Sequence, residues 1–326
     1  MIDRRTFTSA IALIAVSSRV AAQQTRKVWR VGLLITGAGS AGSGNLPRLR
    51  KALDELGYVE GINVTYVERM AGGRIERLPA LATDLIGTGV DVIVTVGSES
   101  TQAAKRATRS VPIVFLGPSY PMEEGLVASF ARPGGNITGI TLAQSDIASK
   151  QLQLLRDLVP TLADVAVIWS PANPGNTFIF RDMEGAAGPL QIKVKSIPIK
   201  VPEEVNPALA QIVHLRPGAL IVLPSQLVIP HIERISELAV KLRLPSISAL
   251  KGFGERGLLL SYGADIRDLE RQVASYVDRI FKGAQPEDLP VERPTKFELT
   301  VNMKTAKALQ LTIPQSLLLR ADERIE

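Results

Sequence analysis

The segment GLLITGAGSAGSGNLPRL, residues 32–49, joins an apolar run to a glycine-rich loop and then to a helical pattern. Gly37, Gly39 and Gly42 have the spacing of the dinucleotide fingerprint, and Glu68 stands where that fold places an acid for the ribose. Helix signals begin only at residues 45–47, so Gly42 falls in the loop and not in the first helical turn. We therefore interpret the segment as the strand, loop and helix of a doubly wound α/β fold without a dinucleotide or other cofactor.

The chain on either side continues the same alternation. Apolar runs at residues 29–35, 62–67, 90–97 and 111–117 alternate with amphipathic segments, the pattern typical of strands and helices. A βαβαβ order predicts a parallel sheet that is covered by helices on both faces.

A second copy of this plan follows in the next half of the chain. VAVIWSP (165–171) corresponds to the first strand, and ALIVLPSQ (219–226), a helix and LPSISA (244–249) repeat the later elements. The remainder after residue 258 does not fit a third copy. We therefore predict two Rossmann-like lobes joined by a multi-strand hinge, with residues 27–136 and 263–290 in lobe 1 and residues 137–262 and 291–326 in lobe 2.

The first residues have the features of an export signal. A basic start with Arg4 and Arg5 precedes an apolar run at residues 10–16, and small residues end at Ala22. We expect a signal peptide over residues 1–22, of the twin-arginine type rather than the Sec type, with cleavage near Ala22 and a periplasmic product without direct membrane insertion.

Charge and composition exclude several classes of function. The formal net charge of +6 falls to about +4 after cleavage, and basic residues alternate with acidic ones instead of forming the stripe of a nucleic-acid binder. The chain has no cysteine, so no disulfide framework is expected. We therefore expect a small-molecule ligand and no nucleic-acid partner.

No residue pattern points to catalysis or to a metal. His214 and His231 stand alone beside apolar residues, and Ser98 in VGSES does not form the Gly-x-Ser-x-Gly elbow but is placed to cap the helix that follows it. The acidic pairs 123–124 and 203–204 have no facing partner. We expect no catalytic residue and no metal site.

The loops that follow the strands are the expected ligand site. In open α/β sheets, ligands bind outside the carboxyl ends of the strands, where helix N-termini also offer free N–H groups. These loops are rich in Ser, Thr, Gly, Asn and Pro, with few aromatic residues. The predicted ligand-binding residues are Thr36, Gly37, Gly97, Ser98, Ser119, Tyr120, Trp169, Asn173, Ser225, Gln226 and Tyr262.

Several stretches together resemble a known family. DVIVTVGSESTQAAKRAT, GLVASFARPGGNITG, VAVIWSPANP and LPVERPTKFEL are similar to the ABC transporter substrate-binding proteins of the tryptophan/tyrosine type, and the likeness extends over residues 28–326. The resemblance implies a type I periplasmic binding protein that is not an enzyme. It implies a monomer that captures a small polar or aromatic molecule, an amino acid or an aromatic carboxylate, and delivers it to an ABC permease and its ATPase.

The sequence departs from that family in candidate pocket loops. Ser119-Tyr120-Pro121 stands where Gly-Asp-Pro is usual, Ser170 replaces Asn in the Trp-Asn-Pro pattern, and Ser225 replaces the Asp of Leu-Pro-Asp. Two acids are thereby replaced by neutral residues, which favours a neutral aromatic molecule or a carboxylate without an amine over an unmodified amino acid. The alternatives are an exported ligand-sensing receptor domain and an exported enzyme.

Overall fold

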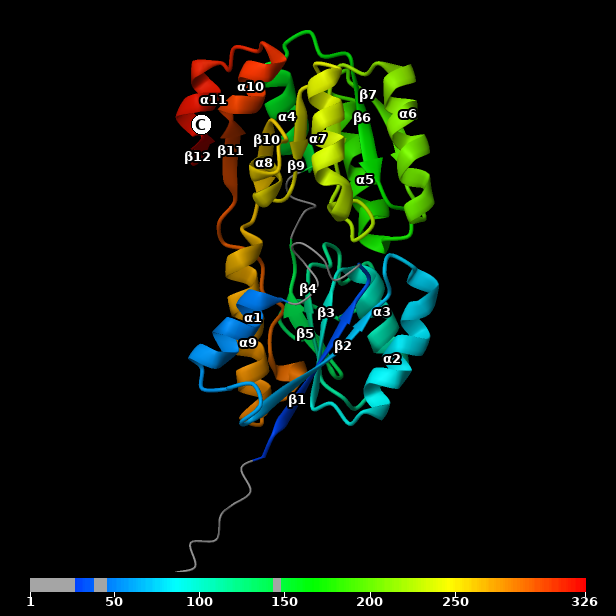
Figure 1. Ribbon diagram of the computed structural model, residues 1–326, viewed down its shortest axis with the longest axis vertical. Coiled ribbons are helices and arrows are strands. Elements are labelled where there is room, and N and C mark those ends of the chain that lie inside the picture. The colour runs from blue at the N-terminus through cyan, green and yellow to red at the C-terminus, as the bar shows by residue number, and fades with distance from the viewer. Residues whose placement is uncertain (1–26, 38–45, 143–147) are drawn as a thin grey trace, which may run out of the picture.

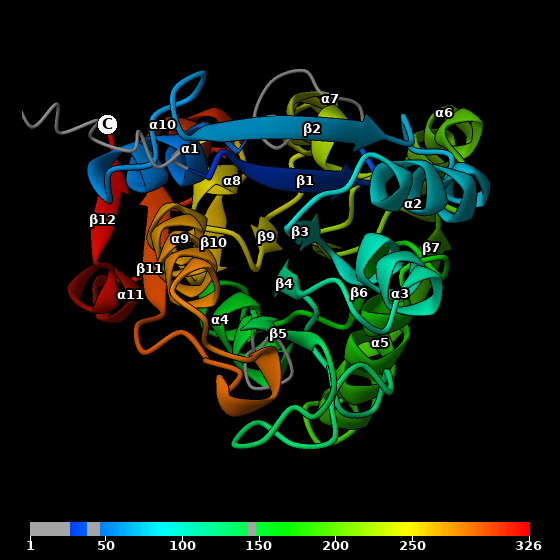
Figure 2. The same ribbon diagram turned by 90° about the horizontal axis from the view of Figure 1, so that it is seen from below.

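The fold consists of two lobes, each built on its own sheet with helices on both faces (Figures 1 and 2). The computed structural model describes residues 27–37, 46–142 and 148–326. The predicted signal peptide, Gly39, Gly42 and Asn45 lie outside these described residues.

The first sheet has the strand order β2-β1-β3-β4-β5, and all of its pairs are parallel. Its strands and helices are β1 (Trp29–Ile35), α1 (Pro47–Glu55), β2 (Val64–Met70), α2 (Leu78–Gly87), β3 (Val92–Val96), α3 (Ser98–Ala107), β4 (Ile113–Leu116), β5 (Ile137–Ile140) and, from later in the chain, α9 (Ile266–Phe281). α1 and α9 pack on one face of the sheet, and α2 and α3 pack on the other.

The second sheet has the order β12-β11-β10-β9-β8-β6-β7, with only β10 and β11 antiparallel among its pairs in the described chain. Its strands are β6 (Asp164–Trp169), β7 (Lys193–Pro198), β8 (Leu220–Val222), β9 (Ser246–Ser248), β10 (Leu260–Gly263), β11 (Glu298–Asn302) and β12 (Glu323–Ile325). Its helices are α4 (Ala148–Leu158), α5 (Pro174–Ala187), α6 (Val205–Leu215), α7 (Ile232–Lys241), α8 (Gly252–Glu255), α10 (Met303–Leu309) and α11 (Gln315–Arg320).

The repeat predicted from the sequence is confirmed in the strand order. The run β7-β6-β8-β9-β10 of the second sheet has the same connectivity as β2-β1-β3-β4-β5 of the first. In both sheets the order reverses beside the first strand, between β1 and β3 and between β6 and β8. These are the topological switch points at which α/β proteins bind ligands.

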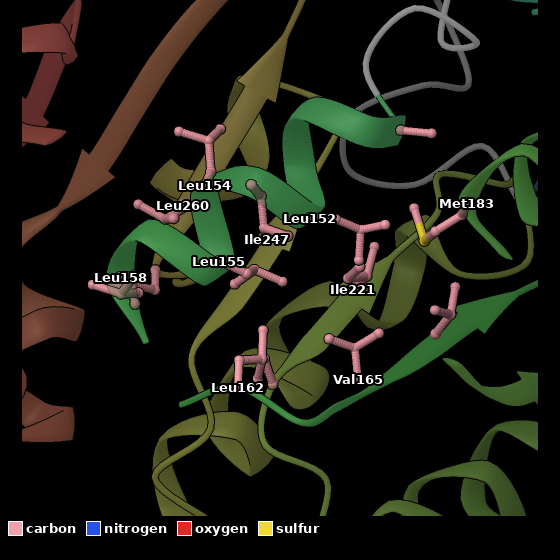
Figure 3. Close-up of a cluster of buried hydrophobic side chains, with 14 of the residues drawn as sticks. Leu152, Leu154, Leu155, Leu158, Leu162, Val165, Met183, Ile221, Ile247 and Leu260 are labelled. Carbon is pink, nitrogen blue, oxygen red and sulfur yellow. The ribbon is translucent and has the colours of Figure 1, made fainter. Parts of the chain in front are cut away.

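Each sheet is stabilised by apolar side chains that are removed from water on both faces. In the second lobe, Leu152 and Leu155 of α4 pack on Ile221 and Ile247 of the sheet, and Met183 of α5 extends the same cluster (Figure 3). A buried leucine of this kind contributes about 1.5–3 kcal/mol. The strands therefore form rigid frames that hold the loops at their carboxyl ends.

The strand Ile137–Ile140 corrects the predicted division of the chain at residue 137. We expected this stretch to open the second lobe, but β5 pairs with β4 through the register Phe115↔Gly139 and completes the first sheet. Its apolar residues pack in the first lobe because Ile137 and Ile140 extend the two cores on either side of that sheet. The chain leaves the first lobe only after this strand.

Among the described elements, the chain changes lobe after β5, after β10 and before β11, as Figure 1 shows. The crossings beside β10 and β11 meet at a charged cluster. Lys251 pairs with Glu298 and lies 3.2 Å from a Glu323 carboxylate oxygen, and Asp265 accepts a hydrogen bond of 2.9 Å from the Arg267 N–H at the start of α9. The lobes are thus joined by several segments that can act together as a hinge.

Candidate functional site

A cavity between the lobes is formed by the loops that follow strands of both sheets. Its polar part, about 50 Å³, is enclosed by loops after β3, β4, β6 and β8. The lining residues are Val96, Gly97, Ser98, Leu116, Gly117, Ser119, Leu142, Asn173, Asn176, Pro224, Ser225, Gln226, Ile229, Leu250 and Ile266. Hydroxyl and amide groups from two lobes therefore surround one small space.

A larger compartment of about 240 Å³ adjoins the polar part. The two share Val96, Leu116, Gln226, Ile229, Leu250 and Ile266. The second compartment adds Leu46 and Phe253, together with six charged residues: Arg48, Glu255, Arg256, Asp265, Arg267 and Glu270. We call the two compartments together the cleft. It offers neutral hydrogen-bonding groups at one end, and apolar side chains beside charged ones at the other.

Contacts between the lobes show that the cleft is closed in this structure. The Tyr120 hydroxyl, in the first lobe, donates a hydrogen bond to Asp182 of α5. Arg74 lies 3.3 Å from a Glu203 carboxylate oxygen of the second lobe. A Cβ at Gly37 would lie 2.8 Å from the Gln226 Oε1, which shows how closely the two lobes approach here.

Six predicted residues line the polar compartment together: Gly97, Ser98, Ser119, Asn173, Ser225 and Gln226. Thr36 and Gly37 lie beside it at the end of β1, and the buried Thr36 hydroxyl has no hydrogen-bond partner within the described residues. The Gln226 Oε1 is likewise buried without a partner in the described chain. Because Gln226 lines the polar compartment, its Oε1 is the one of these two atoms that borders the space for a ligand.

Three predicted aromatic residues do not line the cleft. The Trp169 ring stacks on Phe180 at 4.6 Å, and its Nε1 donates to the Ser196 hydroxyl at 2.8 Å. Tyr262 packs toward Phe297 within the second lobe, with ring centroids 6.3 Å apart. Tyr120 is buried at the boundary between the lobes instead of facing the cavity. Their rings are committed to packing, which sequence position alone does not reveal.

Ser98 does not cap α3 with its side chain, contrary to the expectation from sequence. Gly97 occupies the cap position with φ of 84°, a left-handed region that favours glycine, and Ser98 is the first helical residue. Its hydroxyl instead forms a hydrogen bond with the Glu124 carboxylate. The first turn of α3 therefore presents its N–H groups and one hydroxyl toward the cleft.

Two acidic residues beside the cleft were missed by the sequence reasoning. Burial raises the pKa of the Glu124 carboxyl to about 7, although the Ser98 hydroxyl and the Tyr120 N–H act in the opposite direction. Burial also raises the pKa of Glu99 to about 7, its own N–H opposes the rise, and Glu124 adds to it. Each residue follows a helix or turn pattern that normally exposes an acid, so only the fold shows their burial.

The approach of α5 to the first lobe depends on Gly175. A Cβ at this position would lie 2.9 Å from the Glu124 Oε1, 3.2 Å from the Ser98 hydroxyl and 3.3 Å from the Asn173 Oδ1. These oxygens converge from both lobes. Glu124 is thereby placed next to two residues that line the polar compartment.

Asn176 is a further residue that the sequence analysis did not single out. It is buried, its Nδ2 donates to the Pro224 carbonyl at 3.1 Å, and its Oδ1 accepts from the Ser170 N–H at 3.1 Å. It therefore fixes the loops after β6 and β8 relative to each other. The signal for Asn176 in the sequence was its place in the first turn of a helix that follows a strand.

Other chemistries have little support in the described part of the chain. Glu68, the acid of the rejected dinucleotide pattern, pairs with Arg50 instead of facing the cleft. Within residues 27–37, 46–142 and 148–326, no cluster of His, Cys, Asp or Glu side chains is arranged to hold a metal ion. In the same residues, no helix combines the length and the apolar character needed to cross a bilayer.

Comparisons with known proteins found a matching family model and a related sequence. The family model for ABC transporter substrate-binding proteins matches residues 45–325. A tyrosine-binding protein of Clostridioides difficile (strain R20291) is 27% identical over 263 residues, which are 80% of this chain and 75% of that protein.

Solved structures show the same fold. A conserved domain protein from Vibrio cholerae has a TM-score of 0.83 at 24% identity, covering 91% of this chain and 100% of its own. An ABC domain from Streptococcus pneumoniae in complex with L-Trp has a TM-score of 0.81 at 21% identity, covering 92% of this chain and 100% of its own. These structures share with this chain the two-lobed architecture of periplasmic binding proteins.

Proposed function

This chain belongs to the family of ABC transporter substrate-binding proteins, which are not enzymes, and from that premise we propose that it captures an aromatic amino acid, tyrosine or tryptophan, in the cleft. The relative that is named for tyrosine binding and the related structure that holds L-Trp support this ligand class. The amino acid would enter between open lobes and be enclosed when they close.

The single observation that carries the proposal is that the cleft combines neutral hydrogen-bonding groups from both lobes with an adjoining compartment that contains apolar side chains. The α-carboxylate and α-ammonium groups of an amino acid need hydrogen bonds, whereas an aromatic side chain gains free energy from leaving water. The polar compartment supplies hydroxyls and amides from both lobes, and the adjoining one supplies Phe253, Leu250 and Ile229. A molecule with both kinds of group matches both compartments.

Partners for the charged groups of the ligand lie at the polar end. The N–H groups that begin α3 suit the carboxylate, because a helix N-terminus carries partial positive charge. Glu124, held by Ser98 and the Tyr120 N–H, brings a carboxyl group next to the polar compartment and suits the ammonium group. It supplies an acid that the neutral Ser119 and Ser225 lack, which restores an unmodified amino acid as a ligand.

Closure would follow because the ligand makes more contacts with the closed form than with the open form. A ligand held only by the first lobe would gain the contacts of Asn173, Ser225 and Gln226 when the second lobe swings onto it. The ligand therefore stabilises the closed form by the free energy of those added contacts. In the family setting, the closed protein, exported to the periplasm and acting as a monomer, would deliver its ligand to an ABC permease and its ATPase.

A Ser98→Ala, Gln226→Leu variant tests the cleft directly. The variant loses the Ser98 hydrogen bond that holds Glu124 in the first lobe and the Gln226 amide in the second. Together these losses remove about 2 kcal/mol, so the affinity for L-tyrosine or L-tryptophan is expected to fall about 30-fold. Isothermal titration calorimetry measures this. The exposed Ser110→Ala serves as the control and should bind as the unmodified protein does. Unchanged affinity in the double variant, or turnover of the amino acid, would contradict the proposal.

Tyr120→Phe tests whether lobe contacts outside the cleft support binding. The variant loses the hydrogen bond between lobes to Asp182, which disfavours the closed form by about 1 kcal/mol, so affinity should fall about fivefold. Tyr58→Phe is a matched control because Tyr58 donates to Asp278 within the first lobe, at 2.8 Å. The control should lower the melting temperature without changing affinity. Equal affinities for both variants would show that the lobe contact has no part in closure.

A further inference from the structure

Helices α2 and α3 lie side by side in the first lobe, and α5 of the second lobe contacts α3 (Figures 1 and 2). A second cavity of about 410 Å³ is lined by residues of α2, of α3 and of the loop and first turn of α5. Its lining residues are Ile75, Leu78, Pro79, Thr83, Glu99, Gln102, Ala103, Arg106, Ala107, Ala172 and Pro174. None of these residues also lines the cleft as described above. We call this cavity the side groove.

The side groove and the cleft lie back to back. Ser98 lines the cleft and its neighbour Glu99 lines the side groove. In the second lobe, Asn173 lines the cleft while Ala172 and Pro174 line the side groove. The start of α3 and the loop before α5 therefore form a shared wall, and the side groove is complete only when the lobes are together.

Glu99 is a buried lining residue of the side groove, and its carboxylate lacks a counter-charge within the described residues. Its exposed fraction is only 4%, and within the described residues no hydrogen-bond donor other than its own N–H reaches either carboxylate oxygen. Burial of a carboxylate without a counter-charge is costly, and nearby Glu124 adds repulsion. A ligand with an ammonium group would remove both costs.

The rest of the side groove defines the other end of such a ligand. Arg106 lies seven residues after Glu99 on α3, about 10 Å further along the helix axis. It is exposed and forms no ion pair with any residue of the described chain. Ala103 lies between the two charges on the same face of α3, and Leu78 and Pro79 of α2 add apolar lining to the groove. The order along the groove is therefore acid, apolar wall, base.

We infer that the side groove is a second ligand site for a small elongated zwitterion, with its ammonium group at Glu99, an apolar body and its carboxylate at Arg106. Because Ala172 and Pro174 of the second lobe complete the site, its ligand binds the closed form better than the open one. Binding here consequently increases affinity in the cleft, and by linkage the reverse holds as well.

6-Aminohexanoate is a suitable probe, with hexylamine and hexanoate as analogues that each lack one charge. Calorimetry at pH 8, where Glu99 is mainly ionised, should show the zwitterion binding at least tenfold more tightly than either analogue. Glu99→Gln and Arg106→Gln should each weaken the binding of 6-aminohexanoate at least tenfold. Glu123→Gln removes an exposed acid of the same lobe as a control and should leave binding unchanged.

Two further measurements separate the sites. The Ser98→Ala, Gln226→Leu variant should keep its affinity for the probe, and saturating probe should tighten L-tyrosine binding about fivefold in the unmodified protein. Probe affinity that is absent in the unmodified protein, unchanged in Glu99→Gln or lost in the cleft variant would overturn the inference. Failure of L-tyrosine to bind while the probe binds would count against the proposed function alone.

Discussion

Gly263→Ala is expected to lower the melting temperature by roughly 10 °C. A Cβ at Gly263 would lie 1.6 Å from the Ala249 carbonyl oxygen, and a backbone atom cannot rotate away as a side chain can. Overpacking of this kind costs about 3 kcal/mol, which is equivalent to several degrees up to about 12 °C in a domain of this size. Gly263 ends β10, at a crossing between the lobes, so the backbone shift would also disturb the hinge.

Gly185→Ala is the matched control for this prediction. Gly185 lies on the exposed side of α5, and a Cβ there would meet no atom within 4 Å. Alanine in a helix is about 1 kcal/mol more favourable than glycine, so this variant should melt slightly higher than the unmodified protein. Differential scanning calorimetry compares the two. A Gly263→Ala protein that melts like the unmodified one would contradict the close packing at the hinge.

The second large effect concerns pH and Glu99. Its pKa rises from an ordinary value of 4.5 to about 7 in the folded protein. Between these two values the unfolded chain ionises while the folded one keeps its proton, so the stability contribution present below pH 4.5 is lost as the pH rises to about 7. The loss corresponds to about 3 kcal/mol. The Glu99→Gln side chain does not titrate, so this variant does not lose that stability as the pH rises.

Urea unfolding of both proteins from pH 4.5 to 8 measures this difference. The free energy of unfolding of Glu99→Gln, relative to that of the unmodified protein, should rise by about 3 kcal/mol across this range. Taking the difference between the two proteins removes the opposite contribution of acids such as Asp265 and Glu298, whose pKa values are lowered in the fold. A difference that stays constant with pH would show that Glu99 is ionised throughout.

The architecture could be predicted from the sequence because its signals are local and repeated. Two runs of alternating strands and helices indicate two doubly wound sheets, and the position of a loop after a strand already places Ser98 and Ser225 at the carboxyl edges of their two sheets. The carboxyl ends of the parallel strands lie at one edge of each sheet, irrespective of the side chains that the strands carry. Hydroxyl-rich loops in both halves were therefore sufficient to indicate the polar end of the cleft.

Features that depend on contacts between the lobes could not be predicted in the same way. Glu99 and Glu124 follow patterns that usually expose an acid, and they are buried only because packing within the first lobe and the approach of α5 cover them. Trp169 ends a strand whose side chains alternate between the two faces of the sheet. Its ring packs on the face where Phe180 lies. Such outcomes depend on residues distant in the sequence.

The shared lining of the cleft has a kinetic consequence. Gln226 and Val96 come from opposite lobes yet border both compartments, so we expect a bound ligand to leave only after these residues separate. The dissociation rate would then be limited by how often the lobes part, and a contact remote from the ligand, such as that of Tyr120 with Asp182, would lengthen its residence time without touching it.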